Sequence, residues 1–160
     1  MHTVNYFPAL TDLKDVSVVK ATIQDYLGTP VVSAALRLSP LLFCRPGELR
    51  RLEWSEVNAE EQRIELPDST MKTGEPHIIS LSTQAQAILD ELRSFTGNGR
   101  YVFPSARGKS RPLSENTVRV ALRALGYSND QMTPHGFRAM ARTLLDEVLR
   151  VSCCLNRASR

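Results

Sequence analysis

Hydrophobic residues recur at helical spacing along most of the chain. In the first such stretch, residues 12–27, Val16, Val19 and Ile23 fall on one face, Thr11 offers an N-cap, and Gly28 and Pro30 follow. The same periodicity predicts further helices from Ser82 to Gly97, from Ser114 to Gly126, and from Thr133 to about Arg150. The chain is therefore expected to be mainly α-helical.

The stretch from Val31 to Phe43 differs because it is apolar on most of its sides. A helix without a polar face is usually buried, so we expect a central core helix here. Pro40 should kink or interrupt it, since proline lacks the N–H that the helix needs. Pro46 is favoured in the first turn of a helix, so a short helix should restart after Arg45 and continue to about Leu52.

Strand patterns are confined to the middle of the chain. Residues 63–67 alternate polar and apolar, and residues 69–72 and 77–81 flank the turn sequence Thr73-Gly74-Glu75-Pro76. These segments predict a small antiparallel three-stranded sheet within a mainly α (α+β) fold. Residues 98–112 have the glycine, proline and basic content of a long loop.

Composition narrows the class of protein. A chain of 160 residues, with 42% hydrophobic and 23% charged residues, fits one globular domain. Three cysteines without framework spacing argue against a disulfide-rich secreted protein. The start lacks a signal-peptide pattern, and no apolar run reaches the roughly 18 residues of a membrane span. We therefore expect a cytoplasmic protein without membrane contact.

The charge distribution permits a nucleic-acid partner. The net charge is +3, and basic residues cluster as Arg45, Arg50 and Arg51, as Arg107, Lys109 and Arg111, and as Arg138 and Arg142. A solvated surface is the alternative for each cluster. We assign Arg107, Lys109 and Arg111 as candidate DNA-binding residues because cations close together neutralise phosphates.

Candidate chemistry comes from the order of a few polar residues. Residues 42–57 (LFCRPGELRRLEWSEV) place Arg45 after an apolar helix, with Glu48 three residues later. Lys72 lies in the predicted hairpin, and His135 and Arg138 share a helical face at the start of the last helix. Together these segments resemble the first box, the hairpin lysine and the second box of the tyrosine recombinases, over roughly residues 8–150. The resemblance looks closest to the integrases of phages and genomic islands in enterobacteria.

The resemblance implies a fold, a partner and roles. The fold is the tyrosine-recombinase catalytic domain without its last helices, and the partner is double-stranded DNA of attachment-site type. Arg45 and Arg138 would hold the oxygens of the scissile phosphate, and Lys72 would protonate the leaving oxygen. His135 would donate or accept a proton, and Glu48 would orient Arg45.

No metal and no cofactor is implied by this chemistry, because the arginines supply the positive charge. The alternative for His135 is a zinc ligand. His2 and His77 lie elsewhere, and no cysteine pair completes a tetrahedral set, so we disfavour it.

The nucleophile of the family is missing from the expected place. Tyr6, Tyr26, Tyr101 and Tyr127 all precede the second box, and the last ten residues contain no tyrosine. We expect residues 1–10 to be a linker remnant, 11–150 a partial catalytic domain, and 151–160 a tail outside the family, arising from a frameshift or premature stop.

A recombinase domain without its tyrosine is expected to be inactive as it stands. The open alternatives are a non-enzymatic DNA-binding or regulatory fragment, a nucleophile supplied by another protomer, and a prophage remnant. Family members act as tetramers on DNA, whereas this chain alone is expected to be monomeric.

Overall fold

The computed structural model describes residues 9–10, 12–67, 77–143 and 145. Its named helical elements are α1 (Leu13–Gln24), α2 (Pro30–Leu42), α3 (Pro46–Arg51), the 3₁₀ turn η1 (Trp54–Glu56), α4 (Thr83–Thr96) and α5 (Thr117–Ala124). Residues 136–143 are also helical. The strands are β1 (Val57–Asn58), β2 (Arg63–Leu66), β3 (His77–Ser80), β4 (Pro104–Ser105) and β5 (Gly108–Pro112). The predicted fold class, mainly α with a small antiparallel sheet, is confirmed.

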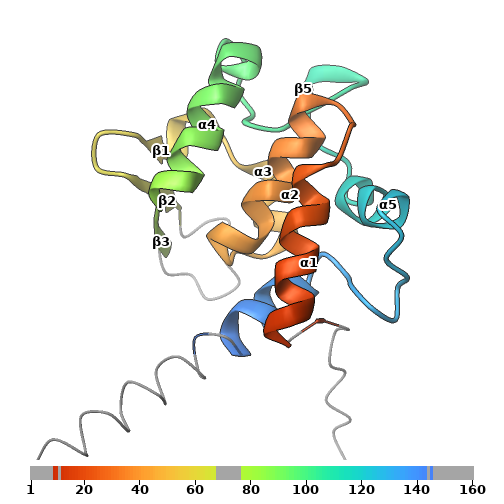
Figure 1. Cartoon of the computed structure of the whole chain (residues 1–160). Coiled ribbons are helices and arrows are strands. Elements are labelled where there is room, and N and C mark those ends of the chain that lie inside the picture. The colour runs from red at the N-terminus through yellow and green to blue at the C-terminus, as the bar shows by residue number, and fades with distance from the viewer. Residues whose placement is uncertain (1–8, 11, 68–76, 144, 146–160) are drawn as a thin grey trace, which may run out of the picture.

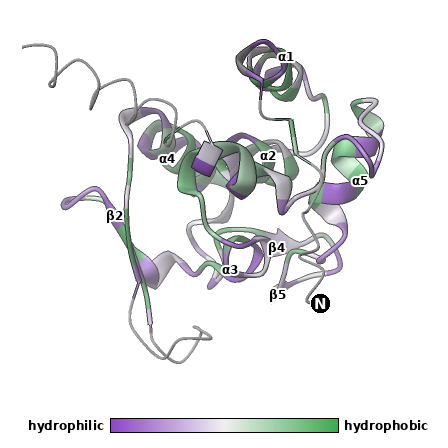
Figure 2. Ribbon diagram, turned by 90° about the horizontal axis from the view of Figure 1, so that it is seen from below, coloured by the Kyte–Doolittle hydropathy of each residue, from purple (hydrophilic) through white to green (hydrophobic). Residues whose placement is uncertain are grey.

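Helix α2 is the centre of the molecule, as its apolar sequence predicts. It contacts α1, α3, α4 and α5, and α1, α4 and α5 surround it in the two ribbon views (Figures 1 and 2). Leu36 and Leu38 of α2 are fully buried, together with Phe103, Leu122 and Phe137 from later segments. Burying a side chain of this size stabilises a fold by about 1.5–3 kcal/mol, so these residues hold the helices around α2.

The ends of the helices differ in two details from the sequence prediction. Asp12, and not Thr11, is the N-cap of α1, because its side chain accepts a hydrogen bond from the Lys14 amide at 2.9 Å. Pro40 does not interrupt α2, which continues to Leu42. Pro40 lies in the last turn, so its missing N–H removes one hydrogen bond close to where the helix already ends.

The three-stranded sheet has the order β1-β2-β3 and is antiparallel throughout. Strands β2 and β3 confirm two of the predicted segments, pairing Ile64 with Ile79 and Leu66 with His77. The predicted strand 69–72 lies outside the described residues, and the third strand is instead β1, which is too short to give a period-2 pattern.

Residues 98–112 were predicted to be a long loop, but part of this segment forms strands. Strands β4 and β5 form a separate two-stranded antiparallel hairpin. Its exposed strand carries polar and basic residues without an apolar alternation, which is why sequence periodicity missed it. The buried Phe103 accepts a hydrogen bond from the Leu113 amide at 2.8 Å and anchors the base of the hairpin.

The only tryptophan of the sequence, Trp54, ties the segment after α3 to the end of α4. Its side chain is 8% exposed, and its indole N–H donates to the Thr96 carbonyl at 3.1 Å. The Arg93 guanidinium stacks 5.0 Å from the ring centroid. These contacts fix the segment that leaves α3.

Several sequence predictions fall on residues that the structure does not describe. They include Lys72, residues 1–8 of the expected linker, and the whole of the expected tail 151–160. Within the described ranges, no helix is long and apolar enough to cross a membrane.

Candidate functional site

Arg45 occupies the sharp break between α2 and α3. Phe43 ends α2 with a positive φ of 53°, and Pro46 opens α3 in the first helical turn, as predicted. Arg45 is the N-cap residue between them, and its carbonyl accepts hydrogen bonds from the amides of Glu48 and Leu49 at 2.9 and 3.0 Å. The backbone that carries the Arg45 side chain is therefore fixed on both sides.

Glu48 holds Arg45 with both of its carboxylate oxygens. Oε2 accepts a hydrogen bond from the Arg45 amide at 2.7 Å, and Oε1 accepts one from Nη1 of the guanidinium at 2.7 Å. The Glu48 side chain is 8% exposed, whereas that of Arg45 is 39% exposed. The guanidinium is thus oriented from its buried side, and its outer donors can reach an anion in solvent.

Arg138 lies close to this turn, although it is 93 positions later in the sequence. The pKa of the Cys44 thiol is raised to about 12, mainly by burial and also by the negative charge of Glu48, while the positive charge of Arg138 lowers it. Cys44 is half-buried, and a charge acts appreciably on such a group only when it is near. Cys44 immediately precedes Arg45, so the structure brings the two candidate arginines to the same region.

The same pKa shift excludes Cys44 as a nucleophile. Nucleophilic cysteines act as thiolates and have lowered pKa values, whereas this thiol stays protonated at neutral pH.

The segment that carries His135 and Arg138 is a turn followed by a helix. The Gly136 amide donates to the Thr133 carbonyl at 2.9 Å and to the Thr133 hydroxyl at 3.1 Å, which closes the turn. Phe137 and Met140 are buried at 1% and 4% exposure, while His135 and Arg138 are exposed. The helix therefore turns its apolar face to the core and both candidate residues outward, as their spacing predicts.

His135 has a pKa below the ordinary value of 6.5. Partial burial lowers the pKa because it disfavours the charged imidazolium, and the negative charge of Glu115 opposes this effect. The imidazole is therefore largely neutral at pH 7 and can donate or accept a proton. The sequence did not indicate Glu115, because no spacing or periodicity relates this residue to His135, which lies 20 positions later.

The three candidate DNA-binding residues lie on the β4–β5 hairpin. Arg107 is exposed between the strands, and Lys109 and Arg111 are exposed on β5, two residues apart and so on one face. Nη1 of Arg50 in α3 donates to the Leu113 carbonyl at 3.4 Å, just after the hairpin. This bond connects the hairpin to α3, the helix that follows Arg45. Arg50 therefore contributes to holding the hairpin in place.

The described tyrosines contact residues other than the candidate site residues Arg45, His135 and Arg138. The Tyr127 hydroxyl donates to Thr22 Oγ1 at 3.4 Å, and the Tyr101 ring lies 5.3 Å from the Arg100 guanidinium carbon. Tyr26 packs against the hydrophobic core. Tyr6 lies outside the described residues, as does Lys72.

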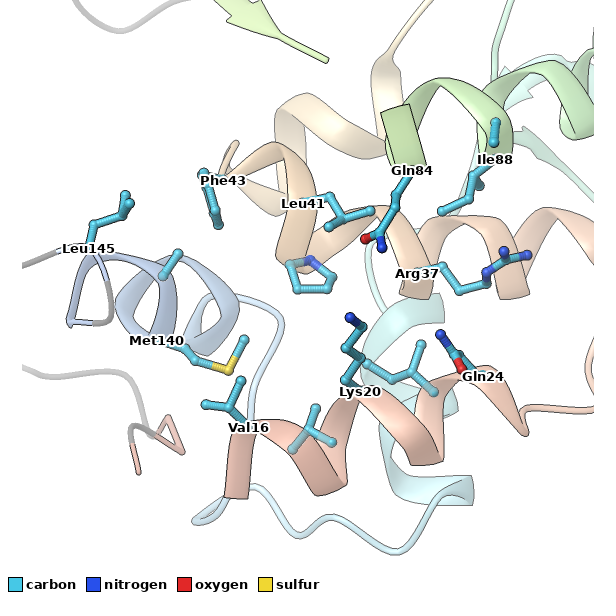
Figure 3. A pocket seen from close by; sticks show the side chains of 15 residues that line it. Val16, Lys20, Gln24, Arg37, Leu41, Phe43, Gln84, Ile88, Met140 and Leu145 are labelled. Carbon is cyan, nitrogen blue, oxygen red and sulfur yellow. The ribbon is translucent and has the colours of Figure 1, made fainter. Parts of the chain in front are cut away.

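A separate apolar groove of about 470 Å³ opens between α1, α2, α4 and the helical residues after His135 (Figure 3). Val16, Leu41, Ile88 and Met140 line it, each from a different one of these segments. Arg45, His135 and Arg138 are not among its lining residues. These three candidate residues therefore lie outside the groove.

The described part of the chain contains no group of three or more histidine, cysteine, aspartate or glutamate side chains that could hold a metal ion. The arrangement instead offers two guanidinium groups and an imidazole, which suit an oxyanion with several acceptor oxygens.

A protein-family model and similar proteins of known sequence both relate the chain to integrases. The family model described as "Phage integrase family" matches residues 32–152. The chain is 36% identical over 155 residues to the protein IntB of Escherichia coli (strain K12), covering 88% of this chain and 38% of that protein. It is 35% identical over 140 residues to the integrase of Enterobacteria phage P4, covering 79% of this chain and 32% of that integrase. The chain thus spans about a third of the length of these relatives.

Solved structures share the fold. XerA recombinase superposes with a TM-score of 0.65 at 19% identity, covering 88% of this chain and 52% of that one. A lambda integrase dimer bound to a COC′ core site superposes with a TM-score of 0.63 at 22% identity, covering 87% of this chain and 50% of that one.

Proposed function

The chain belongs to the phage integrase family, the tyrosine recombinases, and we propose that its exposed arginine site binds a scissile phosphodiester of double-stranded DNA. The observation that carries the proposal is the Arg45–Glu48 pair with Arg138 nearby. A phosphodiester under in-line attack accumulates negative charge on its non-bridging oxygens. A guanidinium fixed in advance, as that of Arg45 is by Glu48, stabilises such charge without reorganising, and one such donor is worth about 3–4 kcal/mol in other enzymes.

Glu48 contributes by holding Arg45 in place. Arginine carries about 2 kcal/mol of side-chain rotamer entropy. The two 2.7 Å bonds from Glu48 restrict that freedom before any DNA arrives. The phosphate then meets an Arg45 guanidinium that is already ordered.

His135 and Lys72 would supply the proton transfers. A largely neutral imidazole beside the phosphate can accept a proton from an attacking hydroxyl or share one with a phosphoryl oxygen. Lys72, between β2 and β3, would protonate the leaving 5′ oxygen, as the family resemblance implies. No step of this scheme requires a metal ion.

The duplex on either side of the phosphate would contact Arg107, Lys109 and Arg111. Their exposure on one hairpin connected to α3 supports this role. The DNA-bound lambda integrase, which shares the fold, is consistent with a duplex partner. We propose that residues 11–150 are the part of the catalytic domain that performs this binding.

Cleavage is a separate matter, because strand exchange in this family needs a tyrosine nucleophile. Tyr26, Tyr101 and Tyr127 have the other partners described above. We propose that the 160-residue chain binds its target but forms no covalent bond to it. A nicked duplex incubated with the protein should give no detergent-resistant protein–DNA band, and such a band would show that a nucleophile is present.

The phosphate-binding proposal is tested by fluorescence anisotropy on a labelled duplex at several salt concentrations. Arg45→Ala should weaken binding about 10- to 100-fold, because a hydrogen bond to a charged group is worth about 1.5–3 kcal/mol. The dependence of log K on log salt should lose about one unit of slope for each phosphate contact removed.

Arg37→Ala is the matched control. It removes the same charge, but Arg37 lines the groove and pairs with Glu91 of α4 at 3.4 Å. The affinity of this variant for the duplex should stay within about threefold of that of the unmodified chain. Equal losses in both variants would mean that only the total charge matters, and the proposed site would be wrong.

A further inference from the structure

The chain makes an ordered reversal between α5 and the segment of His135. The Gly126 amide donates to the Arg123 carbonyl at 2.9 Å, and the Tyr127 amide donates to the Leu122 carbonyl at 3.1 Å. Gly126 has a positive φ of 94°. This pair of bonds with a left-handed glycine is the Schellman motif, which stops a helix and turns the chain sharply.

The segment that follows the reversal is short and partly buried. Ser128 and Gln131 close a turn, in which the Ser128 amide donates to Gln131 Oε1 at 3.0 Å. The Met132 amide donates to the Ser128 carbonyl at 3.1 Å, and the Met132 side chain is fully buried. Three residues after Met132 the chain reaches His135.

Arg123 joins both ends of this segment from the last turn of α5. Nη1 donates to the Tyr127 carbonyl, and Nη2 donates to the Met132 carbonyl at 2.9 Å. Its Nε is buried without a hydrogen-bond partner among the described residues. The planar guanidinium of Arg123 therefore lies within the loop of residues 127–132, and it fixes the two carbonyls relative to one another.

We propose that Arg123 is a positioning residue, which sets where His135 and Arg138 stand by holding residues 127–132 against α5. The inference rests on the proposed function only in taking His135 and Arg138 as site residues. The placement of Arg138 near the Arg45 turn then depends on a half-buried arginine.

The test follows the His135 imidazole by NMR in the free protein. Its signals are identified among the three histidines of the sequence by their absence in His135→Gln. The variants are Arg123→Met, which keeps the stem without donors, and Arg123→Lys, which retains one charged donor group. Arg119→Met is the matched control, because Arg119 is an exposed arginine one turn earlier on α5, and among the described residues its side chain bonds to Asn116 Oδ1 at 2.7 Å.

In Arg123→Met the pKa of His135 should rise toward its ordinary value, since the partial burial that lowers it depends on the held loop. Amide exchange of Met132 should accelerate about 10- to 100-fold, the effect of losing charged hydrogen bonds on local opening. Arg123→Lys should give intermediate values, and Arg119→Met should match the unmodified chain.

An unchanged His135 titration and unchanged Met132 exchange in Arg123→Met would overturn the inference. If that variant does not fold, Arg123→Lys decides alone, and wild-type values there would overturn it equally. A failure of the proposed function is seen elsewhere, as absent duplex binding by the unmodified chain. The free-protein titration does not depend on that result.

Discussion

Replacing Glu48 by glutamine tests whether the Arg45 turn is held as described. The carboxylate makes two charge-assisted bonds of 2.7 Å, and its side chain is 8% exposed. Glutamine keeps the shape and can still accept from the Arg45 amide through its oxygen. Its NH₂ group would then face Nη1 of the guanidinium, donor against donor, so one charged bond is lost and one donor is left badly placed.

The expected cost follows from that geometry. A hydrogen bond to a charged group contributes about 1.5–3 kcal/mol, and a negative charge in the first turn of a helix adds about 0.3–1 kcal/mol. The free energy of unfolding should fall by about 2–3 kcal/mol. With a urea dependence of about 1–3 kcal/mol per molar, the midpoint should move down by roughly 1 M.

Urea unfolding followed by Trp54 fluorescence measures this shift. Glu91→Gln is the control, because its ion pair with Arg37 is long, at 3.4 Å, and solvent-exposed. It should cost less than about 0.5 kcal/mol. A double-mutant cycle of Arg45→Met with Glu48→Gln should give a coupling of about 1–2 kcal/mol. Zero coupling, or equal midpoints for Glu48→Gln and Glu91→Gln, would refute the orienting role of Glu48.

Three further predictions follow from the other features. The pKa of His135 is lowered in the folded chain, so the unfolded chain binds more protons. The contribution of His135 to the free energy of unfolding should be complete above pH 6.5 and should be lost as the pH falls below that value. His135→Gln should flatten this part of a curve of stability against pH, and an unchanged curve would contradict the assignment. Gly126→Ala should cost about 1–2 kcal/mol in urea unfolding, because its φ of 94° strains any residue with a Cβ although no atom lies within 4 Å of that position; a neutral effect would show that the turn can relax. The chain alone should sediment as a monomer, and a dimer at micromolar concentration would disprove this.

Much of the fold follows from local pattern. Helix α2 is recognisable because its sequence is apolar on most sides, and α4 because Ala85, Ile88, Leu89 and Leu92 repeat at helical spacing. The break at Arg45 follows from Pro46. The errors occur where local signals are weak. Strand β1 has two residues, and β5 shows no alternation, so both depend on pairing with segments that the sequence does not identify.

The candidate site also contains residues that the sequence predicts and residues that it does not. Glu48 was predictable as a partner of Arg45, because three residues along a helix start bring the two side chains together. The joint action of Arg45 and Arg138 was not derivable from spacing and was implied only by the family resemblance. Arg123 was missed altogether. Its two carbonyl partners are four and nine residues later, and a bond to a loop carbonyl leaves no signature in sequence.

The groove and the arginine turn share one helix. Arg37, Leu41 and Phe43 line the groove, and Phe43 is the left-handed residue that ends α2, two positions before Arg45. A small molecule that filled the groove would contact Phe43 at the end of α2, outside the residues that we propose bind phosphate, and any coupling between the two would be allosteric. By thermodynamic reciprocity, DNA would change the affinity for such a molecule by the same factor. A screen for compounds in this groove could thus be read out through DNA affinity.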